Sequence, residues 1–226
     1  MSAADSPARQ HGHGLSPNCG PRRNGLTPTL IVLHYTAMAS ADAAVDRLCD
    51  PAAEVSAHYL ICRTGETVPL VPEHLRAWHA GAGEWQGLDD INSRSIGIEL
   101  DNDGRAPFSE PMMATLEVLL RAIMRRHGIP PTGVIGHSDM APGRKSDPGP
   151  RFDWQRLERQ GLAQPRGDPP APVTPTADTF RARAQAHGFT APVDDATLLA
   201  AIRLRYRPWG RGPLTAADHD ALGPAD

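Results

Sequence analysis

Two histidines and one aspartate have the residue types and positions of a metal site. His34 and His137 each end a short apolar run of the kind that forms a buried strand. Asp147 follows His137 by ten residues, and a proline and a glycine between them rule out a continuous helix. A loop that turns back after the strand can bring both side chains to one point. Two imidazoles, one carboxylate and a fourth position left for water form the ligand set of a catalytic zinc site.

A simpler interpretation of each residue alone is available. Either histidine can be a strand-end residue hydrogen-bonded to the backbone, and Asp147 can be a turn residue before a proline. Their combination favours the metal interpretation. The sequence has three cysteines, far apart and without a Cys-x-x-Cys pair, so neither a closed cysteine-rich zinc site nor a disulfide framework is indicated. A His-Glu-x-x-His pattern, typical of an unrelated class of zinc peptidases, is absent from the sequence.

Three motifs together resemble a known family. They are the Leu-His-Tyr-Thr context of His34, the segment Ile-Gly-Ile-Glu-Leu at 96–100, and the segment from Gly136 to Gly149. In order and spacing they resemble the zinc-dependent N-acetylmuramoyl-L-alanine amidases, a superfamily that also contains phage lysozyme-type amidases and animal peptidoglycan recognition proteins. The resemblance covers roughly residues 25–162, and it is closest to bacterial enzymes that act on murein fragments and anhydro-muropeptides.

This resemblance implies one zinc ion per chain, held by His34, His137 and Asp147. It also places the acid/base carboxylate on Glu99 and a cation beside the metal on Lys145. A carboxylate at a strand end can move the proton of an activated water to a leaving amine, and a lysine can stabilise the oxyanion. Read alone, Glu99 can be a salt-bridged strand-end residue, and Lys145 a solvated loop residue.

The implied activity is hydrolysis of the amide bond between N-acetylmuramoyl, or 1,6-anhydro-N-acetylmuramoyl, and L-alanine, in peptidoglycan or its recycled muropeptides. The alternative is a non-catalytic peptidoglycan-binding or recognition protein. Such binders of this superfamily have lost a zinc ligand, whereas this chain retains all three. Retention of the ligands favours the enzyme.

Weaker signals concern the substrate. Trp78 and His79 lie in a segment that resembles the family's Trp-His-x-Gly stretch along the cleft, and we expect them to contact substrate. Asn102 and Arg105 follow Glu99 and can hydrogen-bond sugar or peptide. His58, within an alternating segment, is predicted to be a buried, hydrogen-bonded strand residue and not a ligand.

The composition limits the other partners. A formal charge of -3 and few aromatic residues give no reason to expect nucleic acid. No run approaches the length of a membrane span. The polar N-terminus lacks the apolar region of a secretory signal, so cytoplasm is the expected location, or the cell envelope if a signal was removed. His11 and His13 are interpreted as part of a tail. The oligomeric state is left open.

The periodicity predicts an α/β domain with a central mixed sheet flanked by helices. Expected strands and helices alternate, and residues 73–94 are expected to form a long functional loop. The expected strands are 30–34, 56–62, 67–70, 95–100 and 134–137, and the expected helices are 40–47, 110–127 and 154–160.

Four parts of the chain are expected: a flexible tail at 1–24, the catalytic domain at 25–162, a Pro-rich linker at 163–175 and a helical domain at 176–226. Apolar spacing in the last part predicts three helices, at 177–187, 195–205 and 215–222. Their order resembles the three-helix peptidoglycan-binding module that follows some of these amidases. The alternative is a helical appendage that only packs on the main domain.

Overall fold

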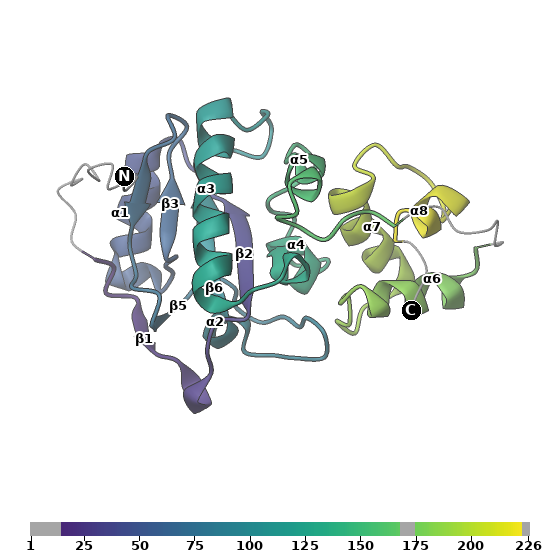
Figure 1. Cartoon of the computed structure of the whole chain (residues 1–226), viewed down its shortest axis with the longest axis horizontal. Helices are drawn as coiled ribbons and strands as arrows, with labels where there is room; N and C mark the ends of the chain where they lie inside the picture. Colours follow the sequence, from purple (N-terminus) through teal and green to yellow (C-terminus); the bar gives the residue numbers. More distant parts are fainter. Residues whose placement is uncertain (1–14, 168–174, 223–226) are drawn as a thin grey trace.

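The computed structural model describes residues 15–167 and 175–222. Figure 1 shows the long helix α3 lying over the strands of the sheet and the C-terminal helices α6, α7 and α8 gathered at one end of the molecule. The tail histidines His11 and His13, and much of the predicted linker, lie outside the described residues. None of the helices in the described ranges is both long and apolar enough to span a bilayer.

A five-stranded mixed sheet in the order β4-β3-β6-β2-β7 forms the centre. All neighbouring pairs are parallel except the edge pair β3-β4. The predicted mixed sheet flanked by helices is therefore confirmed. The strands are β2 (Leu30–Tyr35), β3 (Tyr59–Ile61), β4 (Thr67–Pro69), β6 (Ser95–Leu100) and β7 (Val134–Gly136).

The register of the parallel strands aligns the predicted site residues at one edge of the sheet. His34 lies opposite Glu99, and Leu33 lies opposite Gly136, the residue before His137. Parallel strands present their carboxyl ends at the same edge, which is where ligands bind in open α/β sheets. His34, Glu99 and His137 therefore lie near one another at this edge of the sheet.

Alternation along β2 divides the apolar core into two layers. Ile31 and Leu33 pack in the cluster that contains the apolar face of α3 (Glu110–His127). Leu30 and Val32 point to the opposite face and pack in a second cluster. Because successive side chains of a strand face opposite sides, both faces of this central strand must be covered, and its uninterrupted apolar run reflects that.

Helix α3 has the bounds that the sequence predicts. Pro111 lies in its first turn, where a missing N–H costs nothing, and Gly128 ends it in the left-handed region with φ of 67°. The remaining helices of the sheet unit are α1 (Ala41–Cys49), α2 (Ile91–Arg94), α4 (His137–Met140) and α5 (Trp154–Arg159), with 3-10 turns η1 (Arg23–Gly25), η2 (Pro51–Ala53) and η3 (Pro131–Gly133).

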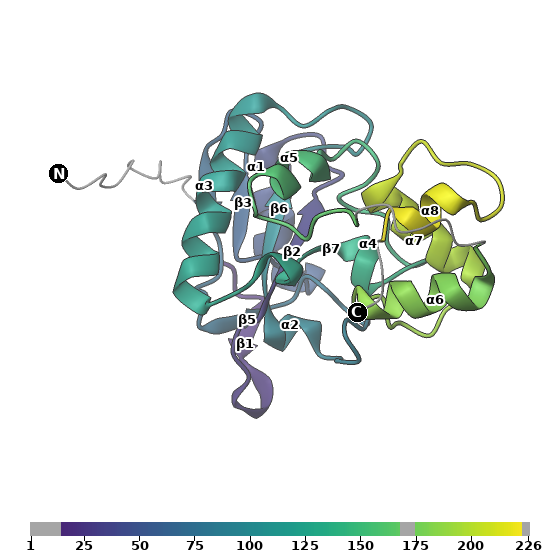
Figure 2. The ribbon, with the colours of Figure 1, turned by 45° about the vertical axis from the view of Figure 1, so that its right-hand side comes forward.

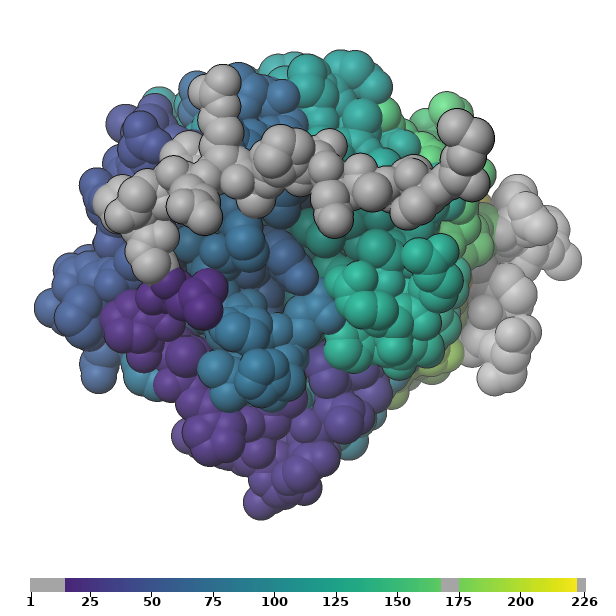
Figure 3. All heavy atoms as spheres, turned by 60° about the vertical axis from the view of Figure 1, so that its left-hand side comes forward, coloured from purple at the N-terminus to yellow at the C-terminus, as the bar shows by residue number. Residues whose placement is uncertain are grey.

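The N-terminal segment from residue 15 is more ordered than the sequence predicted. Strand β1 (Cys19–Pro21) pairs antiparallel with β5 (Leu75–Ala77), so part of the predicted flexible tail and part of the predicted loop 73–94 are strands. Ser16 Oγ donates to the carbonyl oxygen of Leu48 at 2.5 Å, and Asn18 Nδ2 donates to that of Asp50 at 2.8 Å. Figure 3 shows this purple segment lying directly against the blue surface of later residues.

One boundary near the site also differs from the prediction. His137 was predicted to end a strand, but it is the first residue of the short helix α4. Asp139 explains the early end of β7, since its Oδ2 accepts a hydrogen bond from the Gly136 N–H at 2.8 Å. A carboxylate that reaches back from the third helical residue to the N–H of the N-cap residue is typical of the start of a helix.

The three predicted C-terminal helices are confirmed as α6 (Ala177–Ala186), α7 (Asp195–Tyr206) and α8 (Ala216–Asp220). Figure 2 shows α7 next to α4, at the side of the sheet where β7 is the edge strand. Residues of these helices, among them Phe180 and Ile202, share one buried cluster with Val32, Ile135 and Met140 of the sheet unit. The C-terminal helices therefore pack on the sheet unit as the second layer of its core.

Candidate metal centre

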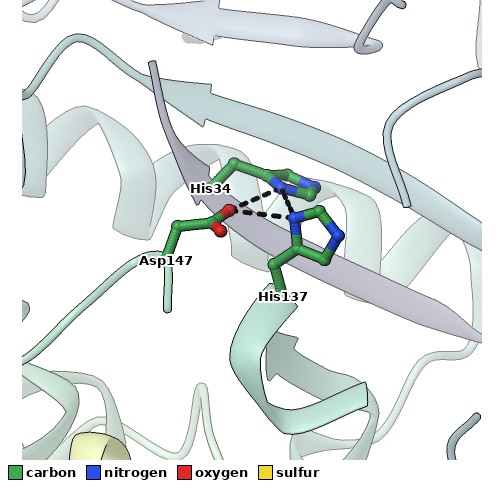
Figure 4. A group of neighbouring side chains, drawn as sticks. All are labelled: His34, His137 and Asp147. Atoms are coloured by element: carbon green, nitrogen blue, oxygen red, sulfur yellow. Dashed lines mark hydrogen bonds and ion pairs between the residues drawn. The ribbon is translucent and has the colours of Figure 1, made fainter. Parts of the chain in front are cut away.

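Three buried side chains from three separate elements converge on one point (Figure 4). His34 comes from β2, His137 from the start of α4, and Asp147 from the loop that follows α4. The Nδ1 atoms of His34 and His137 are 2.9 Å apart. Asp147 Oδ2 lies 2.9 Å from Nδ1 of His34 and 3.0 Å from Nδ1 of His137. The structure thus brings together the three residues that the sequence singled out as ligands.

Hydrogen bonds behind the ligands determine which ring nitrogens carry protons. His137 Nε2 lies 2.9 Å from the carbonyl oxygen of Ala80, which can only accept, so His137 donates from Nε2. Ser95 Oγ donates its single proton to the Ile91 carbonyl oxygen at 2.6 Å and must therefore accept from His79 Nε2 at 3.1 Å.

The same reasoning continues to His34. Because His79 is protonated on Nε2, its Nδ1 accepts from His34 Nε2 at 3.0 Å. In their neutral forms, which metal ligation requires, His34 and His137 both present a bare Nδ1 toward Asp147. Two lone pairs and a carboxylate oxygen at such separations repel one another unless a cation lies among them, and the donor set therefore fits a metal ion.

The charge state of His34 agrees with this role. Burial, followed by the nearby His137, lowers the pKa of His34 from 6.5 to about 4. The ring is therefore neutral near pH 7, as a metal ligand must be.

His79 was predicted to contact substrate, and in the structure its ring contacts the candidate metal ligand His34. Its ring lies between His34 and Ser95, and a side chain on Gly97 would meet it, since a Cβ there would come within 2.5 Å of the His79 Cγ. A glycine at 97 is thus required for the ring to lie behind the ligand. His58 is fully buried, and its Nδ1 accepts from the Gly97 N–H at 2.9 Å, so it is buried and hydrogen-bonded as predicted. It lies one residue before β3 and not within the strand.

The ligands lie in a cavity of about 350 Å³ at the C-terminal edge of the sheet. Its wall combines the three ligands with polar and aromatic side chains and with the apolar side of α1. The lining includes Tyr35, Thr36, Met38, Arg47, Trp78, His79, Glu99, Arg144, Lys145 and Ser146. A concave site of this size with a few convergent polar groups is typical of a small-molecule site.

Glu99 is the carboxyl group in this cavity whose pKa is raised. Its Oε2 is shielded from solvent and has no hydrogen-bond partner. Burial, and next the negative charge of Asp147, raise the pKa of Glu99 from 4.5 to about 8, while Lys145 opposes the shift. Lys145 itself is exposed on the loop before Asp147 and lines the same cavity. A titratable group with a displaced pKa in a cleft is a functional candidate.

The other predicted substrate contacts divide into two groups. Trp78 lines the cavity beside His79. Asn102 does not line it, because its Nδ2 donates to the Ala106 and Pro107 carbonyl oxygens and its Oδ1 accepts from the Gly104 N–H. Its amide therefore holds its own loop together. Arg105 is exposed outside the cavity lining, so the structure brings neither it nor Asn102 to the candidate site.

Sequence reasoning missed the groups that support the ligands. Ser95 supports His34 through His79, and Arg144 donates from Nη2 to the Ala80 carbonyl oxygen at 2.7 Å beside His137. Arg205, far along the chain, reaches Asp139 in the ligand-bearing helix. The sequence offered only one related signal, the glycine two residues after Ser95 on the same strand.

Comparison with known proteins identifies the family. A family model described as N-acetylmuramoyl-L-alanine amidase matches residues 24–150, more than half of the chain. The chain belongs to the N-acetylmuramoyl-L-alanine amidase family. The family resemblance seen in the sequence motifs is confirmed, and the matched segment contains all three ligands, Glu99 and Lys145.

Two curated relatives from Escherichia coli show how far the sequence similarity extends. The chain is 40% identical to N-acetylmuramoyl-L-alanine amidase AmiD over 153 residues, which are 59% of this chain and 53% of that protein. It is 37% identical to 1,6-anhydro-N-acetylmuramyl-L-alanine amidase AmpD over 159 residues, 63% of this chain and 87% of that protein. The chain therefore spans about half the length of AmiD and most of AmpD.

Solved structures extend the likeness to the C-terminal helices. AmpDh3 from Pseudomonas aeruginosa in complex with anhydromuramic pentapeptide has a TM-score of 0.78 and 31% identity, covering 98% of this chain and 96% of that one. AmiD from E. coli in complex with anhydro-N-acetylmuramic acid-L-Ala-D-gamma-Glu-L-Lys has a TM-score of 0.77 and 30% identity, covering 88% and 89%.

Proposed function

We propose that the chain is a zinc hydrolase that cleaves the amide bond between N-acetylmuramoyl, or 1,6-anhydro-N-acetylmuramoyl, and L-alanine. The observation that carries this proposal is the meeting of three kinds of group in one cavity. They are the converging lone pairs of the ligand set, the buried carboxyl group of Glu99 and the ammonium group of Lys145. Together they are what amide hydrolysis needs, because an amide has a poor electrophilic carbon and a poor leaving group.

His34, His137 and Asp147 would hold the metal, and the donor set favours zinc. Two neutral imidazoles and one carboxylate leave a fourth position, the pattern of catalytic and not structural zinc sites. Bound there, zinc would supply a Lewis acid that lowers the pKa of water to about 7.

Glu99 and Lys145 complete the chemistry. The raised pKa of Glu99 in the metal-free chain shows a carboxyl group that binds a proton readily. Beside a bound cation, its carboxylate could take a proton from water and return it to the leaving nitrogen of L-alanine. Lys145 lines the cavity with a positive charge two residues before Asp147, where it can stabilise the negative oxygen of a tetrahedral intermediate.

The substrate class rests on the relatives. The two solved complexes hold anhydromuramic peptides, and both proteins are about 30% identical to this chain over most of its length. We propose that the cavity takes the junction between the muramoyl lactyl group and L-alanine, with Trp78 and His79 as candidate contacts. Comparing the turnover of insoluble peptidoglycan with that of a soluble muropeptide decides whether the polymer or the recycled fragment is the preferred substrate.

The alternative function is recognition of peptidoglycan without cleavage. A pure binder has no use for Glu99 Oε2, whose burial without a hydrogen-bond partner costs stability. The retention of this carboxyl group beside an intact ligand set therefore favours catalysis.

The test uses the purified zinc-loaded chain with two substrates, an anhydro-N-acetylmuramoyl tripeptide and insoluble peptidoglycan. We expect mass spectrometry to find the free sugar and a peptide with a new L-alanine N-terminus, and the Glu99→Gln variant to produce neither at a comparable rate. Products cut at another bond, or equal turnover by the variant, would overturn the proposal. Binding without any product would support the recognition alternative.

We further propose, from the resemblance alone, that residues 176–226 bind glycan. Trp209 is 62% exposed, and an aromatic ring at a surface can stack on a sugar. Trp209→Ala should reduce retention on insoluble peptidoglycan and leave hydrolysis of the soluble tripeptide unchanged. The matched control is Val118→Ala, since Val118 is 70% exposed on α3 of the sheet unit. Equal retention of both variants would favour a helical unit that only packs.

A further inference from the structure

A buried ion pair joins the C-terminal helices to the helix that carries His137. Arg205 lies in α7, and its side chain is 1% exposed. Its Nη1 donates to Asp139 Oδ2 at 2.6 Å, and both terminal nitrogens lie 3.3 Å from the Val134 carbonyl oxygen. The guanidinium also lies over the ring of Trp154, with Cζ 4.1 Å from the ring centroid.

Both acceptors of Arg205 flank the metal ligand in the chain. Val134 begins β7, and Asp139 lies two residues after His137 in α4. The same Asp139 oxygen that accepts from Arg205 also accepts from the Gly136 N–H. One guanidinium thus holds the strand that leads into His137 and the helix that begins with it.

An apolar residue would serve simple docking of α7 better than a charge. The guanidinium lies near the rings of Trp154 and Tyr206, and a buried ion pair contributes little or nothing to stability compared with well-packed hydrophobic residues. The ion pair instead fixes the positions of the acceptor groups relative to α7, because a planar guanidinium bonds only to acceptors in set positions.

We propose that Arg205 is a positioning residue for the metal site, and that it holds His137 in place through Asp139 and Val134. The C-terminal helical unit is then a component of the metal centre as well as a packed layer. This inference rests on the proposed metal site, and it concerns binding of the metal before any substrate is present.

Arg203 supplies a matched control on the same helix. It pairs with Asp218 of α8, with Nε 2.8 Å from Oδ1 and Nη2 2.7 Å from Oδ2, and its other hydrogen bonds go to the Gly212 and Pro213 carbonyl oxygens. The Arg203→Met variant therefore disturbs the C-terminal unit without removing any contact to α4.

The experiment compares full-length Arg205→Met and Arg203→Met with the parent chain. Zinc affinity is measured by competition with a chromogenic chelator, and ligand geometry by the visible absorption spectrum of the cobalt-substituted protein. Loss of a group that orients a metal ligand typically weakens binding about 10- to 100-fold, so we expect this for Arg205→Met together with a changed cobalt spectrum. For Arg203→Met we expect an affinity within about twofold of the parent and an unchanged spectrum.

Equal effects of the two variants, or none for Arg205→Met, would overturn the inference. Should Arg205→Met not fold, Arg205→Lys decides, because lysine keeps the charge opposite Asp139 but lacks the planar guanidinium that fixes the bond directions and lies over Trp154. We expect folded Arg205→Lys to show weaker zinc binding and an altered cobalt spectrum, and parental values would refute the positioning role. A parent chain that binds no zinc would instead overturn the proposed function.

Discussion

Replacing Glu99 by glutamine should make the metal-free protein more stable above neutral pH while removing its activity. Glu99 has a pKa of about 8 in the folded chain against 4.5 for the ordinary carboxyl group. The folded state therefore holds this proton more tightly than the unfolded state. The parent chain consequently loses stability as the pH rises from about 4.5 to about 8, and glutamine, which does not ionise, avoids the loss.

The size of the effect follows from the shift. Each pKa unit corresponds to about 1.4 kcal/mol, which sets an upper limit of about 5 kcal/mol above pH 8. Water in the open cavity screens part of the penalty, so we expect the variant to gain about 2 to 3 kcal/mol at pH 8.5 and almost nothing at about pH 4.5. Loss of general acid–base catalysis should lower turnover about 100- to 10,000-fold.

The assay is urea unfolding of the metal-free parent and variant at both pH values, with turnover of the zinc-loaded forms measured separately. Glu54→Gln is the control, because Glu54 is exposed on the surface, and it should change neither quantity. A variant no more stable than the parent at the higher pH would show that Glu99 is not held protonated by burial. Near-parental turnover would show that the acid/base group is elsewhere.

Three further outcomes are expected. His34→Ala should abolish stoichiometric zinc binding measured by metal analysis, because it removes one of three converging ligands. His79→Phe should weaken zinc binding about 10-fold or more in the chelator assay, since phenylalanine cannot accept from His34 Nε2, and an unchanged affinity would refute the tautomer assignment. A chain ending at Leu162 should show exposed apolar surface by dye binding and a lowered melting temperature, because it uncovers one face of the core; retained stability and activity on the soluble tripeptide would instead show independent domains.

Much of the fold is predictable from local patterns. The bounds of β6 and α3 agree with the sequence, because a buried strand and an amphipathic helix each leave a periodic record in consecutive residues. Proline at the start of α3 and glycine at its end fix its limits for reasons of backbone geometry alone. Helices α6, α7 and α8 were predicted for the same reason, because the spacing of their apolar residues is visible in consecutive sequence.

The sequence did not predict contacts between segments that show no periodic pattern of apolar residues. Residues 15–24 have no apolar period, yet they are held by carbonyl groups of Leu48, Asp50 and Val55 and by a strand more than fifty residues away. Such contacts depend on which backbone groups the folded core leaves unpaired, and this is settled only when distant segments meet.

The candidate site shows the same division. The sequence by itself singled out the candidate ligands, because residue types and the order and spacing of the motifs are present in the linear chain. Only the tertiary structure decided which nitrogen of each histidine is bare, since that depends on Ser95 and Ala80 behind the rings. It also decided that Arg205, sixty-six residues after Asp139, is buried against the helix that carries His137. A charge in a helical pattern indicates a solvated face until packing buries it, and burial is a property of the assembled layers.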